Sequence, residues 1–467
     1  MSENKPDNRR RDFLKLMGAF SVGSLIPLTG CGDTNDSGSS PISGPVPVDA
    51  MTYRTNPKTG DKISLLGYGC MRLPKIPKTE APEGDNDIDQ EAVNASVDYA
   101  LAHGINYFDT SPMYCKGESE RSTGIALSRH KRDKFFIATK LSNFRNFTRE
   151  ASIEMYNNSF KALQVDYLDY YLLHALGMGG IDSFKNRYLD NGMLDFLRKE
   201  REAGRIRNLG WSFHGNAESF DHFLTYDFKW DFVQIQLNYI DWEFPQGMNT
   251  VSAKYVYDEL TKRNIPVIIM EPLLGGRLGR PHFKVQQMLR QAEPEKSFAS
   301  WAFRFAATPP NVLNVLSGMT FMEHLQDNLR TFSPLKPLSE KEYALLAEAA
   351  KIMSQYQNII CTACQYCMPC PYGIDIPGVF GHYNRCLNEG HFPVNEQDPD
   401  YQKARRAFLI SLDRNVEKLR QASHCTGCGI CVKECPQSIK IPQEMEKIDR
   451  FIAVSYTHLT LPTKRIV

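Results

Sequence analysis

Two dense cysteine runs near the C-terminus constrain this chain more than any other feature of its sequence. The second run has the spacing C-x2-C-x2-C-x3-C followed by proline, and the first run differs only in a last gap that is one residue shorter. Four thiolates at this spacing on a tightly turning chain are the ligands of a cubane 4Fe-4S cluster. The runs therefore predict an iron–sulfur module that handles single electrons. The cysteines are Cys361, Cys364, Cys367 and Cys370 in the first run, and Cys425, Cys428, Cys431 and Cys435 in the second.

Other uses of these cysteines agree less well with the sequence. A secreted disulfide framework scatters cysteines through a short chain, whereas most of the 12 cysteines here are grouped within a chain of 467 residues. Four thiolates also suit a structural zinc ion, and this alternative stays open for the first run. In two-cluster ferredoxins the fourth cysteine of each run binds the other cluster. On that pattern one cluster has Cys361, Cys364, Cys367 and Cys435, and the other has Cys425, Cys428, Cys431 and Cys370.

The length and charge of the chain indicate several folded modules and no nucleic-acid partner. From its length of 467 residues we expect the chain to fold into two or three domains. Its 55 Lys and Arg residues are balanced by 54 Asp and Glu residues, and neither a basic block nor an acidic tail stands out. The balanced charge therefore indicates no binding to nucleic acid, whereas the cysteine runs suggest a redox partner protein and the motifs described below suggest a small-molecule substrate.

The N-terminus has the layout of an export signal. Arg10 and Arg11 precede an apolar stretch, Leu16–Leu28, as in twin-arginine signals, although an ordinary basic N-terminus is the alternative. The stretch is too short to span a bilayer as a stable helix. Leu28–Cys31 resembles a bacterial lipobox, which predicts a lipid anchor at Cys31 as the membrane attachment. We expect a periplasmic, lipid-anchored protein, with a soluble periplasmic product as the alternative.

Between residues 63 and 332, apolar runs rich in β-branched residues alternate with amphipathic stretches. Runs such as 135–139 are almost wholly apolar, as strands buried on both faces are. Stretches such as Asp89–His103 and Thr148–Val165 have helical periodicity. Eight strands alternating with helices over roughly 250 residues predict an α/β fold, the (β/α)8 or TIM barrel. The expected strands are Ile63–Met71, Asn106–Ser111, Phe135–Leu141, Leu168–Ala175, Ile206–Phe213, Asp231–Asn238, Pro266–Pro272 and Val312–Met319.

Polar side chains follow three neighbouring strands of this barrel where each strand ends. Asp109 closes the second strand and Tyr114 lies just beyond it, while Lys140 closes the third strand and His174 the fourth. Active sites of such barrels lie at the carboxyl ends of the strands, so these side chains should converge. An ammonium favours the ionised form of a nearby phenol, and a buried carboxylate holds the ammonium in place. Taken singly, Lys140 could be a rim charge and His174 a core histidine, but four together favour an acid–base site.

The sequence around these residues resembles the aldo/keto reductase family over about residues 52–332. The whole chain resembles the bacterial subgroup that adds a C-terminal 4Fe-4S ferredoxin-type module. The resemblance implies that Tyr114 is the general acid, that Lys140 and Asp109 tune it, and that His174 positions a substrate carbonyl. It also implies hydride transfer between NAD(P)H and an aldehyde or ketone. The motifs are Phe108–Tyr114, Gly117–Glu120, Ala138–Lys140, Asp166–Asp169, Leu172–His174, Glu271–Leu273 and Gly275-Gly276.

The same resemblance implies a nicotinamide nucleotide site that departs from the family pattern. Phe213 follows Ser212 where an asparagine is common. Met270 stands where many members stack a tyrosine on the nicotinamide. Residues Met319–His324 lack the Arg or Lys that the 2′-phosphate of NADP prefers, so NADP preference stays open. The implied contacts are Ser212 and Gln234 at the carboxamide, Leu273, Gly275 and Gly276 of the loop Leu273–Leu278 over the pyrophosphate, and Ser317, Gly318 and Asn328 at the adenosine end.

Joining a hydride site to iron–sulfur clusters leaves three interpretations. A hydride carries two electrons while a cluster passes one, so a flavin often mediates, although no sequence feature here identifies a flavin site. In the first interpretation the clusters exchange electrons with a carbonyl reductase through a mediator. In the second the clusters are structural or sense redox conditions. In the third the barrel is degenerate and the protein is an anchored electron-transfer partner, which the intact four-residue site disfavours.

The expected architecture is a TIM barrel followed by a small, mainly helical ferredoxin-like iron–sulfur domain. Lys403–Gln421 has apolar residues at helical spacing, including Leu419, and should pack in that domain as a helix. Cys70, Cys115 and Cys386 are expected to be packing residues. The expected segments are 1–31, an export signal with lipobox; 32–51, a flexible linker; 52–335, the barrel; 336–454, the iron–sulfur domain with a helical insert; and 455–467, a tail that resembles translated adapter sequence.

Overall fold

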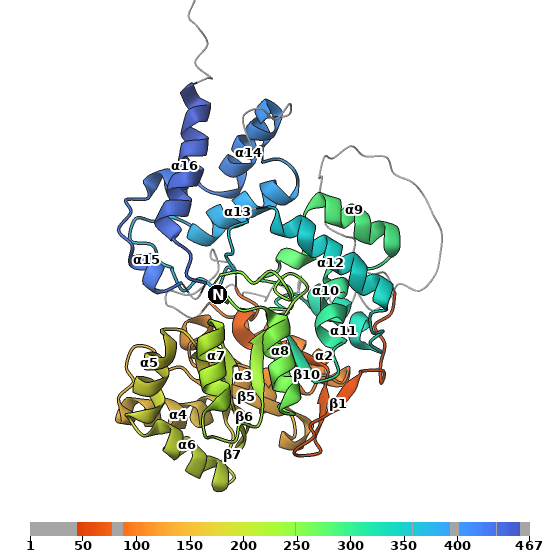
Figure 1. The fold of residues 1–467 in the computed structure, drawn as a ribbon, viewed down its shortest axis with the longest axis vertical. Helices are drawn as coiled ribbons and strands as arrows, with labels where there is room; N and C mark the ends of the chain where they lie inside the picture. The colour runs from red at the N-terminus through yellow and green to blue at the C-terminus, as the bar shows by residue number, and fades with distance from the viewer. Residues whose placement is uncertain are drawn as a thin grey trace, which may run out of the picture. The chain divides into compact units, whose positions relative to one another are not determined.

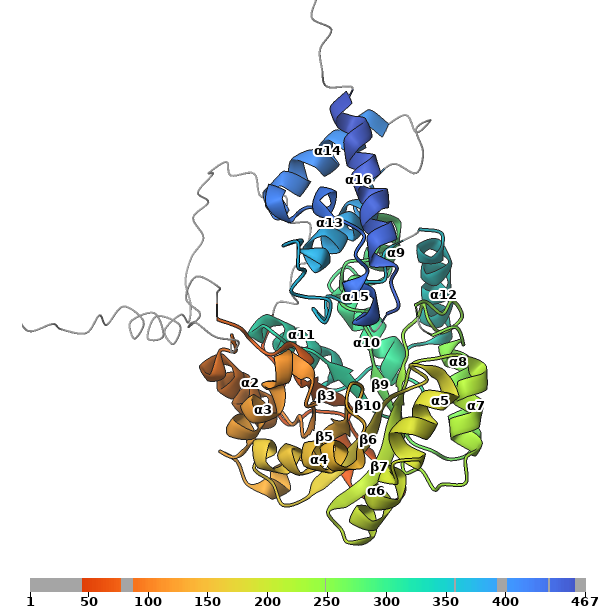
Figure 2. The same cartoon turned by 90° about the vertical axis from the view of Figure 1, so that its left-hand side faces the viewer.

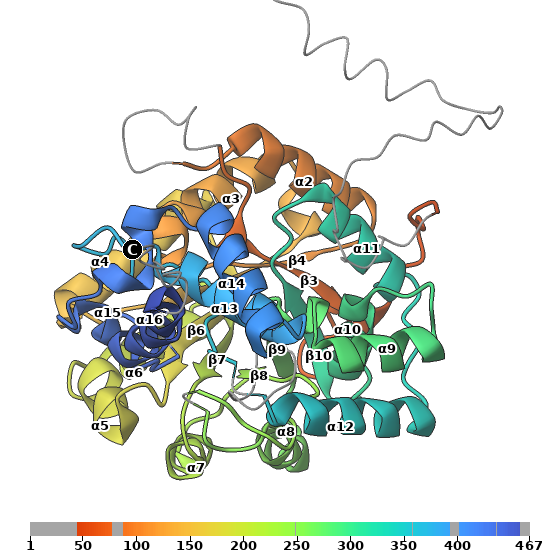
Figure 3. The ribbon, with the colours of Figure 1, turned by 90° about the horizontal axis from the view of Figure 1, so that it is seen from above.

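Eight parallel strands close into a barrel ringed by helices (Figures 1 and 3). Each strand pairs with its neighbours in the sequence, and the last strand pairs with the first to close the ring. The computed structural model thus confirms the predicted (β/α)8 barrel. Its strands are β3 (Leu66–Gly69), β4 (Tyr107–Asp109), β5 (Phe136–Leu141), β6 (Leu168–Leu176), β7 (Ile206–Phe213), β8 (Val233–Gln236), β9 (Val267–Met270) and β10 (Val312–Ser317).

The first predicted strand, Ile63–Met71, is divided in two in the structure. Its first residues belong to β2 (Lys62–Ser64), which forms an antiparallel pair with β1 (Tyr53–Thr55), and only β3 enters the barrel. The Asn106 side chain accepts from the backbone N of Ser64 and donates to the carbonyl oxygen of Lys62. These bonds hold β2 at the end of the barrel, so a run that reads as one strand serves two sheets.

Several of the helices around the barrel begin at side-chain caps that the sequence supplies. Asp89 and Thr148 accept hydrogen bonds from the backbone N of Ala92 and Ala151. The expected helices near 89–103 and 148–165 are therefore confirmed. The helices are α2 (Gln90–Ala102), α3 (Ser119–Leu127), α4 (Arg149–Leu163), α5 (Gly180–Phe184), α6 (Met193–Glu202), α7 (Ala217–Thr225), α8 (Ala253–Lys262), α9 (Phe283–Ala292), α10 (Phe298–Ala307) and α11 (Met322–Phe332).

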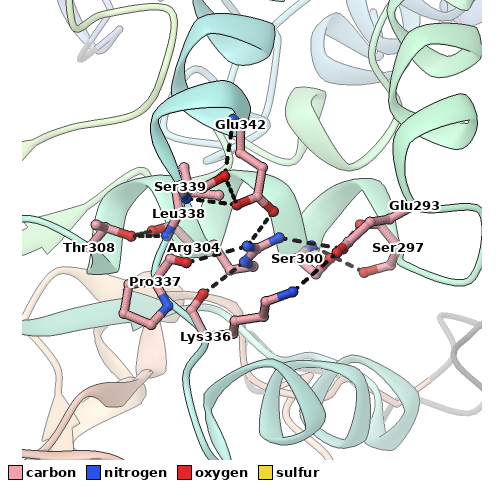
Figure 4. A network of polar contacts seen from close by, with 10 residues as sticks. All are labelled: Glu293, Ser297, Ser300, Arg304, Thr308, Lys336, Pro337, Leu338, Ser339 and Glu342. Carbon is pink, nitrogen blue, oxygen red and sulfur yellow. Dashed lines mark hydrogen bonds and ion pairs between the residues drawn. The ribbon is translucent and has the colours of Figure 1, made fainter.

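Helix α12 (Glu340–Ser354) packs on the barrel rather than on the iron–sulfur region. Figure 4 shows Arg304 of α10 donating to Glu342 of α12 at 2.5 Å and to the carbonyl oxygen of Lys336 at 2.9 Å. Ser339 and Glu342 form a capping box that starts the helix. Leu346 and other buried residues of α12 belong to the hydrophobic core of the barrel. The change from one core to the next therefore falls after this helix, later than the boundary expected at residue 335.

The C-terminal region has its own hydrophobic core, built mainly from helices. Phe380, Phe408 and Met445 are buried within it, and their helices are blue in Figure 2. The predicted helix Lys403–Gln421 ends early, because a short 3-10 turn follows it and leaves Leu419 77% exposed. The packing expected for Leu419 was therefore wrong. The helices are α13 (Ile376–Asn388), α14 (Tyr401–Asn415), α15 (Ile430–Lys433) and α16 (Ile441–Thr457).

The structure describes residues 44–76, 87–247, 249–356, 358–392, 401–435 and 437–457. The expected export signal, the lipobox with Cys31 and most of the expected linker lie outside these residues, as does most of the expected tail. Within the described residues, no helix combines the length and the apolar character that crossing a membrane requires.

Candidate active site and iron–sulfur sites

Four side chains predicted to form a site meet at the carboxyl ends of the barrel strands. The ammonium of Lys140 lies 2.6 Å from Oδ1 of Asp109 and donates to the carbonyl oxygen of Thr110 at 2.8 Å. The same Nζ lies 4.9 Å from the centre of the Tyr114 ring. The rings of Tyr114 and His174 meet edge to face, with centres 6.1 Å apart. The structure therefore brings all four residues to one mouth.

The phenol of Tyr114 is held in its protonated form. Burial raises its pKa well above 10, and the charges of Asp109 and Glu271 act in the same direction. We expected the Lys140 ammonium to favour the phenolate, but burial and the two carboxylates dominate in the structure. A tyrosine that keeps its proton suits the role of a proton donor rather than that of a base.

The imidazole of His174 is neutral. Burial lowers its pKa well below 6.5, and the cations Lys140 and Arg187 lower it further. The hydroxyl of Ser142 lies 2.5 Å from Nδ1 of His174 and 2.9 Å from the hydroxyl of Ser111. Arg187 donates to the carbonyl oxygen of His174 at 3.0 Å. The ring is thus fixed through Nδ1, which leaves Nε2 for a substrate.

The ion pair beneath the site is fully buried. Burial raises the pKa of Asp109, and the ammonium of Lys140 opposes that rise. Both side chains are almost inaccessible to solvent, with 1% of Lys140 and 3% of Asp109 exposed. Such a pair holds its geometry strongly, because separating the charges would leave one of them without a partner.

Three residues of this site were not predicted from the sequence. Ser142 lies two residues after Lys140, so strand alternation could have placed both on one side of β5. Arg187 comes from the short π-helical turn Lys185–Leu189, whose composition carries no local signal for a contact with the histidine. Glu271 follows β9, and only the closed barrel brings its charge close to the tyrosine.

The residues expected at a nicotinamide carboxamide lie side by side. Ser212 of β7 pairs in register with Gln234 of β8. The Ser212 hydroxyl accepts from the backbone N of Ala175 at 2.8 Å. Oε1 of Gln234 is buried and has no hydrogen-bond partner within the described part of the chain. An unpartnered buried acceptor beside the catalytic mouth fits a ligand amide, so this end of the site suits a nicotinamide.

The residues expected at the other end of the nucleotide also meet. Asn328 of α11 donates to the Ser317 hydroxyl at 3.0 Å. A Cβ placed on the neighbouring Gly318 would lie 3.5 Å from Cβ of Arg72, so these two residues are in contact. Ser317 and Asn328 therefore pair with each other, and Gly318 is covered by an arginine from the far end of the barrel sequence.

The loop expected to cover the pyrophosphate touches the iron–sulfur region instead. Gly275 and Gly276 have positive φ angles of 68° and 95°, as a tight loop requires. A Cβ on Gly275 would lie 2.7 Å from Cα of Thr362, which stands inside the first cysteine run. Leu273, the third residue expected here, packs partly buried against the barrel core. At this end of the site protein atoms lie where the sequence predicted a nucleotide.

The thiols form two sets with an exchanged fourth member, as expected from two-cluster ferredoxins. Burial and the charge of Cys435 raise the pKa of each of the first three thiols of run one. Burial and the charges of three other cysteines raise the pKa of Cys431. One pocket is lined by all four members of this second set. The first set is Cys361, Cys364, Cys367 and Cys435, and the second set is Cys370, Cys425, Cys428 and Cys431.

These thiol sets fit 4Fe-4S clusters. The cysteines of both sets are free thiols, so no disulfide competes for them. Within the described ranges, no three His, Cys, Asp or Glu side chains gather closely enough to share a single metal ion. A cubane cluster places its thiolates on four separate iron atoms, so its ligands do not need to converge on one point.

Comparison with known proteins agrees with both halves of this description. Residues 66–351 match the model of the aldo/keto reductase family, more than half of the chain. The chain belongs to the aldo/keto reductase family. Residues 360–441 match a 4Fe-4S dicluster domain, which contains both cysteine runs. The protein is therefore an oxidoreductase of the aldo/keto reductase kind with an added 4Fe-4S domain.

Relatives of known activity are distant. L-Galactose dehydrogenase of Arabidopsis thaliana is 24% identical over 319 residues, which cover 64% of this chain and 94% of that protein. The NADH-specific methylglyoxal reductase of Escherichia coli is 23% identical over 328 residues, covering 63% and 96%. An aldo-keto reductase from Klebsiella pneumoniae, solved in complex with NADPH, superposes with a TM-score of 0.50 at 19% identity, covering 65% and 96%. That structural likeness shows the fold alone.

Proposed function

We propose that the protein interconverts a small aldehyde or ketone and its alcohol at the Tyr114 site by transfer of a hydride and a proton, and that two 4Fe-4S clusters exchange electrons with this reaction one at a time through a mediator that carries two electrons. The observation that carries this proposal is the buried Lys140–Asp109 pair, which lies beneath Tyr114 with His174 at the same mouth. The distant relatives that act on carbonyl or alcohol substrates over almost the whole barrel support the same class of reaction.

We propose a separate task for each side chain of the site. Tyr114 keeps its proton at neutral pH and would donate it to the carbonyl oxygen as the alcohol forms. Lys140 faces the ring at 4.9 Å and stabilises negative charge that develops on the phenol oxygen. Asp109 fixes that ammonium. Neutral His174, bound through Nδ1 to Ser142, would hold the carbonyl oxygen with Nε2.

We propose NAD(P)H as the hydride source. When bound, it would supply a hydride, which is equivalent to two electrons and one proton. Ser212 and Gln234 would hold its carboxamide, because Gln234 has an unpartnered buried acceptor. The clusters would supply single-electron transfer, and the thiols of the two sets would hold them. A flavin is the alternative mediator between these steps. A distant relative named as NADH-specific supports a nicotinamide, without deciding between NADH and NADPH for this chain.

One observation favours a second candidate function, that of an electron-transfer protein with a barrel that binds no nucleotide. Thr362 lies against Gly275, in the loop where the pyrophosphate was expected. If that loop never opens, the barrel would serve as a scaffold for the clusters. The two candidates differ in whether the protein binds NADH or NADPH at all.

Anaerobically purified protein, titrated with NADH and then with NADPH, tests both candidates. Iron and acid-labile sulfide give the cluster content, protein fluorescence reports nucleotide binding, and electron paramagnetic resonance reports cluster reduction. The main proposal requires nucleotide binding, carbonyl turnover and bleaching of the cluster absorbance. Cluster-replete protein that binds neither nucleotide and turns over no carbonyl would support the second candidate instead.

We further propose export by the twin-arginine route and a lipid anchor at Cys31, on the layout of residues 10–31. Iron–sulfur clusters are assembled in the cytoplasm, and the twin-arginine route accepts folded proteins. Export by this route is therefore compatible with a protein that carries such clusters. Replacing Arg10 and Arg11 with lysine should retain the protein in the cytoplasm, as fractionation would show. Mass spectrometry of the mature N-terminus separates a lipidated Cys31 from simple cleavage.

A further inference from the structure

Arg72 of the barrel binds the loop that carries the first thiol set. Arg72 ends the short 3-10 turn η1 (Cys70–Arg72), directly after β3. Its guanidinium donates to the carbonyl oxygen of Thr362, and its own carbonyl oxygen accepts from the Thr320 hydroxyl at 2.9 Å. Within the described part of the chain, no carboxylate forms an ion pair with Arg72. This partly buried cation therefore has a backbone carbonyl as its hydrogen-bond partner. Its positive charge is not neutralised by that carbonyl and can act on another nearby group.

The positive charge of Arg72 can act on the thiols on either side of Thr362. Thr362 stands between Cys361 and Cys364 in the sequence, so the hydrogen bond from Arg72 to its carbonyl oxygen places the guanidinium beside two members of the first thiol set. Reduction adds a negative charge to a cluster that is already anionic. A fixed cation beside two of its ligands favours the reduced form and so raises the reduction potential.

The same contact places the first thiol set at the catalytic mouth. Thr362, to which Arg72 donates, lies between two cysteines of that set, and Arg72 directly follows Met71 in turn η1. The thiol of Cys115 lies 3.5 Å from the carbonyl oxygen of Met71, which joins the turn of Tyr114 to the turn of Arg72. Loops after the last two strands of such barrels often bind phosphate. Here the loop after β9 contacts the cysteine loop at Gly275, and the loop after β10 contacts Arg72 at Gly318.

The second thiol set has a different exposure. Cys428 is exposed, and the nearby apolar side chains of Tyr372 and Ile430 are 49% and 56% exposed. An electron carrier from outside can therefore reach the second set more readily than the first set, whose loop is bound to the barrel.

We propose that Arg72 is a positioning residue that binds the first cysteine loop to the barrel mouth and raises the reduction potential of the cluster held there. The first cluster then serves the Tyr114 site, and the second receives or delivers electrons outside. This inference rests on the proposed function only in requiring that both clusters assemble.

The test is a redox titration of full-length, anaerobically purified protein, followed by electron paramagnetic resonance. The signal lost in the Cys364→Ser variant identifies the first cluster. At the wild-type midpoint of that cluster, Arg72→Met should lower the ratio of reduced to oxidised first cluster about tenfold, which is about 59 mV for a one-electron couple. The second cluster should keep its midpoint. Arg72→Lys keeps the charge and should recover most of the shift.

Arg145→Met is the matched control, because Arg145 also joins the barrel to the module through an ion pair with Glu434 at 2.6 Å. Its side chain is 75% exposed, so its charge is screened and the midpoints should not move. Unchanged midpoints in Arg72→Met, equal shifts of both clusters, or the same shift in Arg145→Met would overturn the proposal. If Arg72→Met loses iron, Arg72→Gln carries the test, and a wild-type midpoint there overturns it equally. Carbonyl turnover tests the proposed function separately from these potentials.

Discussion

The barrel site and the iron–sulfur module hold their functional side chains in different ways. In the barrel, Lys140 is bound by Asp109 and a backbone carbonyl, and His174 is bound by Ser142, so protein atoms fix the geometry. The first cysteine run has neither helix nor strand between residues 358 and 370. We infer from this difference that the barrel site can form without its cofactors, whereas the module depends on inorganic iron and sulfide to complete its structure.

The largest expected effect comes from removing one ligand of the module. Cys435→Ser should remove the first cluster and lower the iron content from about eight to about four atoms per chain. The barrel should keep its thermal unfolding transition, because none of its core residues depends on the cluster. Iron analysis and calorimetry make the measurement. Cys386→Ser is the control, since Cys386 is buried outside both sets and should leave the iron content unchanged.

The next effect concerns the chemistry of the barrel alone. Tyr114→Phe removes the proton donor and should lower kcat for carbonyl reduction by about 10²–10⁴. Its resonance signals should match those of the wild type, because the phenol oxygen is no cluster ligand. Steady-state kinetics and electron paramagnetic resonance of the same sample make the comparison. Retained turnover would show that another group donates the proton.

A third prediction measures how strongly protein atoms fix the barrel site. Asp109→Asn leaves the Lys140 ammonium buried without its counter-charge and should lower the free energy of unfolding by about 3–5 kcal/mol. Asp98→Asn is the control, since Asp98 pairs with Arg129 at 2.7 Å on the surface and should cost at most about 1 kcal/mol. Urea unfolding of both variants measures the two losses of unfolding free energy and compares them. Equal losses would mean that the buried pair contributes no more than an exposed one.

The smallest effect is a pH dependence of the barrel. Burial lowers the pKa of His214 to about 4, below the value of about 6.5 for an unfolded histidine. The unfolded chain therefore takes up a proton first, and stability present above pH 6.5 is lost as the pH falls toward 4. In the His214→Gln variant, the total loss of unfolding free energy between pH 6.5 and pH 4 should be smaller by about 1–3 kcal/mol. Unfolding curves measured across that range test it, and an unchanged slope would exclude His214 as the titrating group.

Much of the barrel could be predicted from its sequence because buried parallel strands are continuous apolar runs. β5 and β7 lie within a residue of the expected Phe135–Leu141 and Ile206–Phe213. The four polar residues at strand ends also converged, since any closed barrel brings those ends to one mouth. The hairpin of β1 and β2, and the packing of α12 on the barrel, depend on partners distant in sequence. No local pattern distinguished them.

The electrostatics of the site could not be predicted in the same way. The sequence placed an ammonium near Tyr114, but the pKa of the phenol depends on burial and on Glu271, which the fold brings from another strand. Likewise, Leu419 had helical spacing but lies in a turn where no apolar partner covers it. Burial is a property of the whole assembly, so residue spacing alone does not fix it.

The sequence by itself determined the two thiol sets and the barrel, because ligand spacing and strand burial are local properties of the chain. Tertiary packing places the first cysteine loop against Gly275 and Arg72, and Arg72 follows Met71, whose carbonyl oxygen lies near the Cys115 thiol. The bond from Arg72 to Thr362 joins residues 290 positions apart along the sequence. Shape and charge complementarity between two separately folded surfaces produces such contacts, and no short motif encodes it.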